Sequence, residues 1–258
     1  MDIIDREVKR KKDLLLLLTK KEVTLKYKRT VLGILWSLLN PLILGLVLFI
    51  AFTIFLRFHM ENYTFFLLSA LFPWTWFSTS VTISSGTLIA NIQLVKKVRF
   101  PRYFLVLATV LTHLVNFLFS LPVIVALAYY YGKGPSIIWL LGIPILIVLQ
   151  FMATTGISLM VSILNAYFRD MEYIIAVFVN LLFWMTPIVY PLDMVPAAYR
   201  LYLAINPLTY LITAWRDIFM SSAIRWGNIG ISCLVSLVFL SFGILLFQKL
   251  GKRLDEVI

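Results

Sequence analysis

The chain has 258 residues, of which 61% are hydrophobic and only 14% are charged. A soluble domain averages about a quarter charged residues and about half apolar ones. This composition therefore excludes an ordinary soluble globular protein and also a disordered chain. Lys and Arg total 23 against 12 Asp and Glu, which gives a formal net charge of +11. In a chain this apolar, the basic excess indicates membrane topology and not a nucleic-acid partner.

Residues 1–30 are predicted to form an amphipathic helix on the cytoplasmic surface of the membrane. Apolar side chains recur at helical spacing among the basic residues of this segment, at Val8, Leu15, Leu18 and Leu25. Two compatible interpretations stay open: a basic anchor on anionic headgroups, or a helix that rests on a partner subunit and shapes a lateral entrance. The leucine run at 14–18 is too short for the apolar core of a signal peptide.

Six charge-poor stretches follow, each matched to the ~30 Å of hydrocarbon that about 20 helical residues cross. The predicted spans are residues 36–56, 64–90, 104–130, 137–164, 173–190 and 226–248. Pro73 predicts a break or bend within the second span, because proline removes a helical hydrogen bond. The predicted fold class is therefore an all-α integral membrane protein whose transmembrane domain occupies residues 31–258.

Residues 193–225 are apolar but do not fit a crossing. Leu201–Trp215 is free of charge over only 15 residues, and Asn206-Pro207 interrupts it. That length favours a re-entrant segment. We expect a helical hairpin that dips into the outer leaflet between spans five and six.

The distribution of basic residues predicts the orientation. With six spans and both termini in the cytoplasm, 18 of the 23 Lys and Arg residues lie inside. The five outside are Arg57, Lys133, Arg200, Arg216 and Arg225. The positive-inside rule therefore favours cytoplasmic termini, and a seventh span would place the basic C-terminal end on the wrong side.

Several kinds of chemistry are missing from the sequence. There is no phosphate-binding loop, no zinc-binding His pair and no cysteine pair, because Cys233 is the single cysteine. Ion- and proton-coupled carriers need ionisable or polar groups at mid-membrane. The polar candidates there are Asn116, Gln150 and Asn180, for which interhelical hydrogen bonds are expected, and His113 is expected to be a packed side chain. We therefore predict that the chain is not an enzyme and binds no cofactor or metal. Energy for any active transport would then come from another subunit.

Aromatic residues make up 15% of the chain. Most are expected to form interfacial belts or core contacts. A pore for carbohydrate would also use aromatic rings, because the C–H faces of sugars stack on them and a long glycan can slide along such a wall. The candidates are Phe72, Trp74, Trp76, Phe77, Phe178, Phe183 and Trp184.

Four segments together resemble one family, the membrane subunit of type-2 ABC exporters of O-antigen, capsule and teichoic acid polysaccharides. They are Tyr27–Trp36 leading to Asn40-Pro41, Ala90–Arg102, Tyr167–Asp170, and Thr186–Tyr190 leading to Asn206–Thr209 and Trp215–Asp217. Each alone is weak, and their order and spacing are specific. Thr186-Pro187 departs mildly from the Ser-Pro that is usual in the family.

The resemblance implies a homodimer of six-span subunits in the bacterial cytoplasmic membrane, bound to two cytoplasmic ATPase subunits that hold ATP and Mg. It also implies a lipid-linked polysaccharide as cargo, extruded through a channel at the dimer interface. Residues 91–102 and the turn after span four are then expected to couple to the ATPase, through Asn91, Lys96, Lys97, Arg99, Arg102, Arg169 and Asp170. The basic cluster would otherwise serve topology alone.

Two further sites follow from the same resemblance. Basic groups where the surface helix meets the bilayer are expected to attract a lipid pyrophosphate or ordinary anionic lipid, at Lys26, Lys28 and Arg29. The hairpin at 193–225 is expected to form an outer gate with Pro187, Tyr190, Asn206 and Pro207.

Two alternative functions stay open. An ABC permease could instead export small hydrophobic drugs. A membrane-embedded transferase of lipid-linked glycan or acyl groups would need a nucleophile–base pair or metal-binding acids at the membrane surface. The acids in the last four connections are Asp170, Glu172, Asp193 and Asp217, and they form no recognisable catalytic arrangement.

Overall fold

The computed structural model describes residues 2–28, 30–97 and 100–254 of the chain. Within these ranges the ordered elements are helices, and no strand is present. Five helical stretches are long and apolar enough to cross a membrane. They are α2 (Leu35–Phe49) with the π-helical segment η1 (Ile50–Phe55), α3 (Tyr63–Ala90), α5 (Tyr103–Tyr130), α6 (Ile137–Tyr167) and α10 (Trp226–Gly251). They correspond to spans one, two, three, four and six of the sequence.

The fifth predicted span is not one long helix. Helix α7 (Met171–Met185) has 15 residues, or about 22 Å at the helical rise of 1.5 Å per residue. It ends at Thr186, whose backbone is extended (φ −104°, ψ 137°), because a residue that precedes proline disfavours the helical conformation. The chain continues through an irregular turn to the 3₁₀ segment η2 (Leu192–Met194).

Helix α3 runs without interruption through Pro73, so the predicted break does not occur there. Proline has no N–H for the carbonyl of Ser69, four residues earlier. The side-chain amide of Gln150 on α6 donates to the carbonyl of Pro73 (2.7 Å), which holds α3 against α6 at this turn. The Thr75 hydroxyl donates to the carbonyl of Leu71 (2.7 Å) within α3. Helix α3 lies at the centre of the bundle and contacts α2, α5, α6, α7 and α9.

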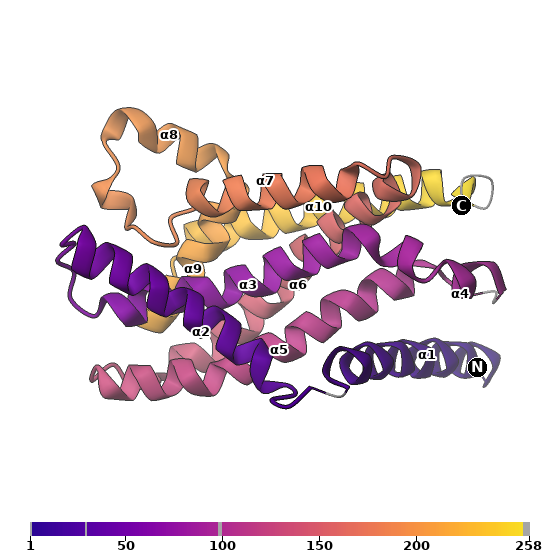
Figure 1. Cartoon of the computed structure of the whole chain (residues 1–258), viewed down its shortest axis with the longest axis horizontal. Coiled ribbons are helices and arrows are strands. Elements are labelled where there is room, and N and C mark those ends of the chain that lie inside the picture. The colour runs from indigo at the N-terminus through magenta and orange to yellow at the C-terminus, as the bar shows by residue number, and fades with distance from the viewer. Residues whose placement is uncertain (1, 29, 98–99, 255–258) are drawn as a thin grey trace.

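The helices have two distinct ends in Figure 1. The start of α1 (Asp2–Tyr27), the short helix α4 (Ile92–Lys97) and the end of α10 lie at one end, here called the terminal end. Helix α8 (Ala197–Ile205) and the α2–α3 and α5–α6 turns lie at the opposite end, here called the hairpin end. Helix α7 leads from the terminal end toward α8. Helix α9 (Pro207–Ser221) then returns into the bundle against α3, α6 and α10.

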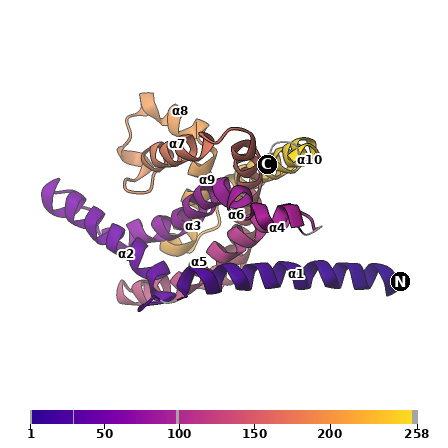
Figure 2. The same cartoon turned by 45° about the vertical axis from the view of Figure 1, so that its right-hand side comes forward.

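Helix α1 runs in a different direction from helix α10 of the bundle. It packs on α5, and Figure 2 shows it at full length in a view in which α10 is strongly foreshortened, so the two helices are not parallel. Leu18 is buried in this contact, whereas Leu16, Leu17 and Leu25 are exposed. An apolar helix face that the bundle does not cover is typical of a helix at a membrane interface.

Candidate functional site

A groove of about 450 Å³ lies between α2, α3 and α7. Three aromatic rings line it, those of Trp74, Phe183 and Trp184. The Trp74 and Phe183 ring centroids are 5.8 Å apart, and those of Phe183 and Trp184 are 5.2 Å apart. The rings thus form a continuous aromatic strip between α3 and α7, in which Trp74 and Phe183 are buried and Trp184 is exposed.

Polar groups lie beside this aromatic strip. The hydroxyls of Ser78, Thr79 and Thr82 and the amide of Asn180 also line the groove. Rings and hydroxyl or amide groups together match the two faces of a sugar, whose C–H side stacks and whose hydroxyls form hydrogen bonds. We predicted an interhelical hydrogen bond for Asn180, but its side chain is exposed in the groove. The hydroxyls were missed, although their three- and four-residue spacing along the predicted second span could have shown that they share one helix face.

The seven predicted channel aromatics do not form one set. Phe77 packs on Trp74, with ring centroids 5.5 Å apart, and so supports the strip from the buried side. Phe72 and Trp76 line a second cavity of about 80 Å³ toward α5. Phe178 is exposed on α7 and does not line the groove. The structure thus brings four of the seven together and separates three.

The turn after α7 is held at the hairpin end by two buried donors. The Tyr63 hydroxyl donates to the carbonyl of Val189 (3.0 Å), and Nη2 of Arg216 donates to the carbonyl of Ile188 (2.9 Å). Ile188 and Val189 are fully buried. These bonds supply partners for backbone carbonyls that no helix satisfies. We refer to residues 186–190 as the 186–190 turn.

Arg216 itself is 9% exposed, and its guanidinium carbon lies 3.6 Å from the centroid of the Phe66 ring. Stacking on an aromatic face is a favoured environment for a guanidinium group, because the ring face carries a negative quadrupole. The sequence contained Arg216 within a motif but gave no role for it. Only the structure shows that it reaches from α9 to the 186–190 turn.

Asn206 joins three segments at the same place. Its Oδ1 accepts from the backbone N–H of Leu208 (3.1 Å), which caps α9, and Pro207 occupies the first turn of that helix. Its Nδ2 donates to the carbonyl of Met185 (3.2 Å) and to Oγ1 of Thr186 (2.9 Å). The nearby Tyr190 hydroxyl donates to the carbonyl of Trp184 (2.8 Å), and Pro187 is buried. The four predicted gate residues therefore lie together around one turn.

At the terminal end, the predicted coupling residues differ in exposure. Lys96 and Lys97 are exposed on α4, and Arg169 and Asp170 are exposed in the α6–α7 turn. Asn91 directly follows the last residue of α3. Its Nδ2 donates to the carbonyl of Thr87 (3.0 Å), and its Oδ1 accepts from the ammonium group of Lys21 on α1 (3.3 Å). Asn91 therefore connects two helices. Arg99 lies outside the described residues.

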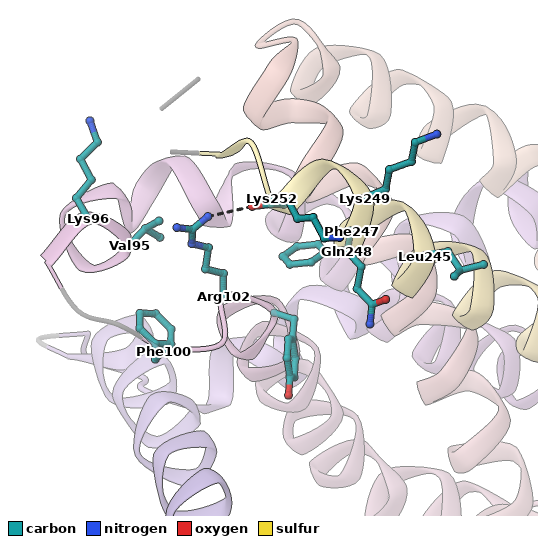
Figure 3. Close-up of a pocket in the computed structure, with 11 residues that line it drawn as sticks. Val95, Lys96, Phe100, Arg102, Leu245, Phe247, Gln248, Lys249 and Lys252 are labelled. Atoms are coloured by element: carbon teal, nitrogen blue, oxygen red, sulfur yellow. Dashed lines mark hydrogen bonds between the residues drawn. The ribbon is translucent and has the colours of Figure 1, made fainter. Parts of the chain in front are cut away.

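Arg102 belongs to a cleft of about 1,000 Å³ between α4, the start of α5 and the end of α10. Its Nη1 donates to the carbonyl of Gly251 (3.2 Å), as Figure 3 shows. The Tyr167 hydroxyl at the end of α6 donates to the neighbouring carbonyl of Leu250 (2.7 Å). These two bonds fix the end of α10 to α5 and α6.

Two of the three predicted lipid-entry residues can be placed. Lys26 and Lys28 are both exposed near the end of α1, and Arg29 lies outside the described residues. Lys26 also lines the cavity of about 80 Å³ together with His113 and Asn116, and desolvation lowers the pKa of its ammonium group. Next to it, the Tyr27 hydroxyl donates to Oδ1 of Asn116 (2.9 Å). This bond ties the end of α1 to α5.

His113 and Gln150 have the structural roles that the sequence predicted. His113 is buried and within hydrogen-bonding distance of the Thr79 hydroxyl (3.3 Å). Gln150 joins α3 to α9, because its Oε1 accepts from the indole N–H of Trp215 (2.6 Å) while its amide donates to Pro73.

Comparison with known proteins identifies the family of this chain. The model of the ABC-2 type transporter family matches residues 13–220. The chain belongs to the ABC-2 type transporter family. The match covers α2 to α8 and all but the last residue of α9, and hence the groove, the 186–190 turn and α4. Members of this family and the apolar helices identify a multi-pass protein of the bacterial inner membrane.

Individual relatives match this chain over most of its length. The chain is 39% identical over 246 residues to an O-antigen export system permease protein RfbA of Klebsiella pneumoniae, with 95% of each chain covered. It is 35% identical over 217 residues to the protein of the same name from Myxococcus xanthus, with 83% of each covered. It is 24% identical over 231 residues to the polysialic acid transport protein KpsM of Escherichia coli, covering 88% of this chain and 90% of KpsM.

Proposed function

We propose that this chain is the transmembrane subunit of an ABC exporter that carries lipid-linked polysaccharide of the O-antigen type across the bacterial inner membrane. The observation that carries the proposal is the 39% identity over 95% of both chains to a protein named as an O-antigen export permease. The drug-exporter and transferase alternatives draw no support from the relatives described above.

The proposed topology places the terminal end in the cytoplasm and the hairpin end outside. It is supported by the 18 basic residues that this arrangement keeps inside. The fifth crossing is then made by α7 together with the 186–190 turn. Irregular backbone at membrane depth is tolerated where protein buries it, and this turn is buried.

ATP hydrolysis in this proposal takes place in two cytoplasmic ABC ATPase subunits, which bind ATP and Mg. The permease chain holds no cofactor. Helix α4 and the α6–α7 turn contact the ATPase subunits, because both expose charged side chains at the terminal end, at Lys96, Lys97, Arg169 and Asp170.

Two copies of the chain enclose the channel in this proposal, and the groove between α2, α3 and α7 forms each copy's wall. A glycan stacks on the exposed Trp184 ring, behind which Phe183 and Trp74 are packed, while its hydroxyls exchange partners among Ser78, Thr82 and Asn180. Many weak contacts suit a long polymer better than one tight site, because tight binding at any point would stop its movement.

The ends of the channel have separate roles. The 186–190 turn and α8 form the outer gate, held closed at rest by Tyr63, Asn206 and Arg216. The cationic groups of Lys26 and Lys28 attract the pyrophosphate of the lipid carrier at the junction of α1 and α2, since each basic group contributes about 1 kcal/mol near an anionic surface.

The test is purification of the tagged chain in mild detergent from its native host, followed by analysis of what accompanies it. We expect a stoichiometric cytoplasmic subunit and vanadate-sensitive ATP hydrolysis. We also expect that deleting the gene removes surface glycan and leaves drug tolerance unchanged. A chain that purifies alone, in a preparation where ATP has no effect, would contradict the proposal.

A further inference from the structure

The largest cleft described above lies at the terminal end and has two walls of different origin. One wall comes from α4 and the start of α5, with Val95, Lys96 and Phe100, and the other comes from the end of α10, with Phe247, Lys249 and Lys252. Figure 3 shows Lys96 and Lys249 on opposite sides with Arg102 between them. Its volume of about 1,000 Å³ equals the upper range of ligand pockets.

The lining of this cleft is cationic at the edges and apolar at the base. Lys96, Lys249 and Lys252 are exposed, whereas Val95 and Phe247 are buried. No acidic side chain lines the cleft among the described residues. An acidic segment with one apolar side chain would match both features, since charge complementarity selects a partner and a buried apolar anchor holds it.

The end of α10 is also joined to neighbouring helices of the bundle by hydrogen bonds and by close packing. Arg102 and Tyr167 donate to the carbonyls of Gly251 and Leu250, which links α10 to α5 and α6. Further along, Gly156 of α6 and Gly243 of α10 pack backbone against backbone. A partner seated in the cleft would therefore act on three long helices and not on α4 alone.

We propose that this cleft is a composite docking surface for an acidic segment of the partner ATPase subunit, with the end of α10 as its second wall. The inference rests on the proposed function and extends it. The sequence analysis predicted contact with the ATPase only at residues 91–102 and at the α6–α7 turn, whereas this cleft adds the end of α10. The end of α10 lies beyond the 13–220 family match.

The first experiment is site-specific photocrosslinking in native membranes. Cys233→Ala gives a cysteine-free background, since Cys233 is the single cysteine. Lys249→Cys and Lys252→Cys are labelled separately with a benzophenone maleimide, and the adducts are identified by mass spectrometry. Glu61→Cys, exposed in the α2–α3 turn at the hairpin end, is the matched control. We expect an ATPase adduct from both cleft positions and none from Glu61→Cys.

The second experiment measures ATPase retention without a probe. Lys249→Glu with Lys252→Glu should lower the amount of ATPase that copurifies about tenfold, because the new carboxylates would face the acidic segment and repel it. The same positions changed to Gln should have a smaller effect. Arg57→Glu with Lys133→Glu, in the α2–α3 and α5–α6 turns at the hairpin end, controls for net charge, and size-exclusion profiles check folding of every variant.

Each result decides the inference. If the unmodified chain retains the ATPase but the cleft positions crosslink only to lipid, or the reversed lysines retain it normally, the cleft is not a docking surface and the proposed function stands. If the unmodified chain retains no ATPase at all, the proposed function fails and this inference fails with it.

Discussion

Single side chains fix the backbone of the 186–190 turn, and Arg216 is the strongest case. It combines a hydrogen bond to Ile188 with a stacking contact on Phe66. We expect Arg216→Met to cost about 2–4 kcal/mol, because it leaves a buried carbonyl unpaired and removes a cation–π contact. Thermal unfolding in detergent measures the loss, and proteolysis near residues 186–196 reports the loosened turn.

The control for this prediction is Arg225→Gln. Arg225 pairs with Asp217 (3.4 Å); 65% of the Arg225 side chain is exposed, whereas Asp217 is buried. Asn228 also donates to Oδ2 of Asp217 (3.3 Å), so the carboxylate keeps a partner without Arg225. We therefore expect Arg225→Gln to cost about 1 kcal/mol, less than Arg216→Met. Equal destabilisation by the two substitutions would contradict the role assigned to Arg216.

Asn206 allows a finer test at the same scale, because its two functions can be separated. Asn206→Ser keeps a hydroxyl that can cap α9 but loses the donor to Met185 and Thr186, whereas Asn206→Ala loses both. We expect Ala to destabilise by about 1 kcal/mol more than Ser, the usual value of a helix N-cap. Identical unfolding temperatures for the two variants would show that the cap carries no stability.

At the scale of helices, the α6–α10 pair depends on close backbone approach. A Cβ at Gly156 would overlap the carbonyl of Phe239, and a Cβ at Gly243 would overlap the carbonyl of Gly156. Gly156→Ala or Gly243→Ala should therefore separate the helices and lower stability by about 1–3 kcal/mol, as overpacking does in cores. Small residues permit this approach in membrane helices generally.

Gly230→Ala on the same helix is the matched control. Nothing lies within 4 Å of a Cβ built there, and Ala favours helix over Gly by about 1 kcal/mol. We expect unchanged or raised stability, measured by the same unfolding assay. A loss at Gly230 equal to that at Gly156 would show that the substitutions do not act through overpacking at the α6–α10 contact, because Gly230 has no such contact.

The groove gives the matching functional prediction. Trp184 and Phe178 are both exposed on α7, at 51% and 54%, but only Trp184 lines the groove. Trp184→Ala should lower glycan export several-fold with little change in stability, because about 1 kcal/mol of stacking is removed at one point of the wall. Phe178→Ala should leave export unchanged. Pulse-labelling of surface glycan measures both, and the reverse order would exclude this face as the channel wall.

Individual elements show how far the sequence could lead. Charge-free length located α2, α3, α5, α6 and α10, because hydrocarbon thickness sets that length directly. The continuity of α3 through Pro73 was not predictable, since a side chain of another helix contacts that turn. The end of α7 at Thr186 did have a signal in the sequence, because Thr186 precedes Pro187, but the prediction followed the charge-free length instead. The same holds for the site. The sequence predicted that aromatic side chains would line a channel, but it could not show that Phe72 and Trp76 lie on the side of α3 that packs on α5.

For the whole molecule, the charge distribution predicts one orientation that labelling can test. In a Cys233→Ala background, Glu61→Cys at the hairpin end should react with a membrane-impermeant maleimide in intact spheroplasts. Lys12→Cys at the terminal end should react only after permeabilisation. Labelling of both positions from outside would overturn the assignment of the terminal end to the cytoplasm.

The shortness of α7 has a consequence for hydration. Its 15 residues leave the carbonyls that follow without helical partners, and at rest Tyr63 and Arg216 supply donors to those of Val189 and Ile188. In the proposed exporter, outward movement of the 186–190 turn would break those bonds, and lipid tails offer no replacement. Water would then have to reach the turn at the moment it moves, so the proposed channel would hydrate as it widens. Its opening would be limited by wetting as well as by the glycan.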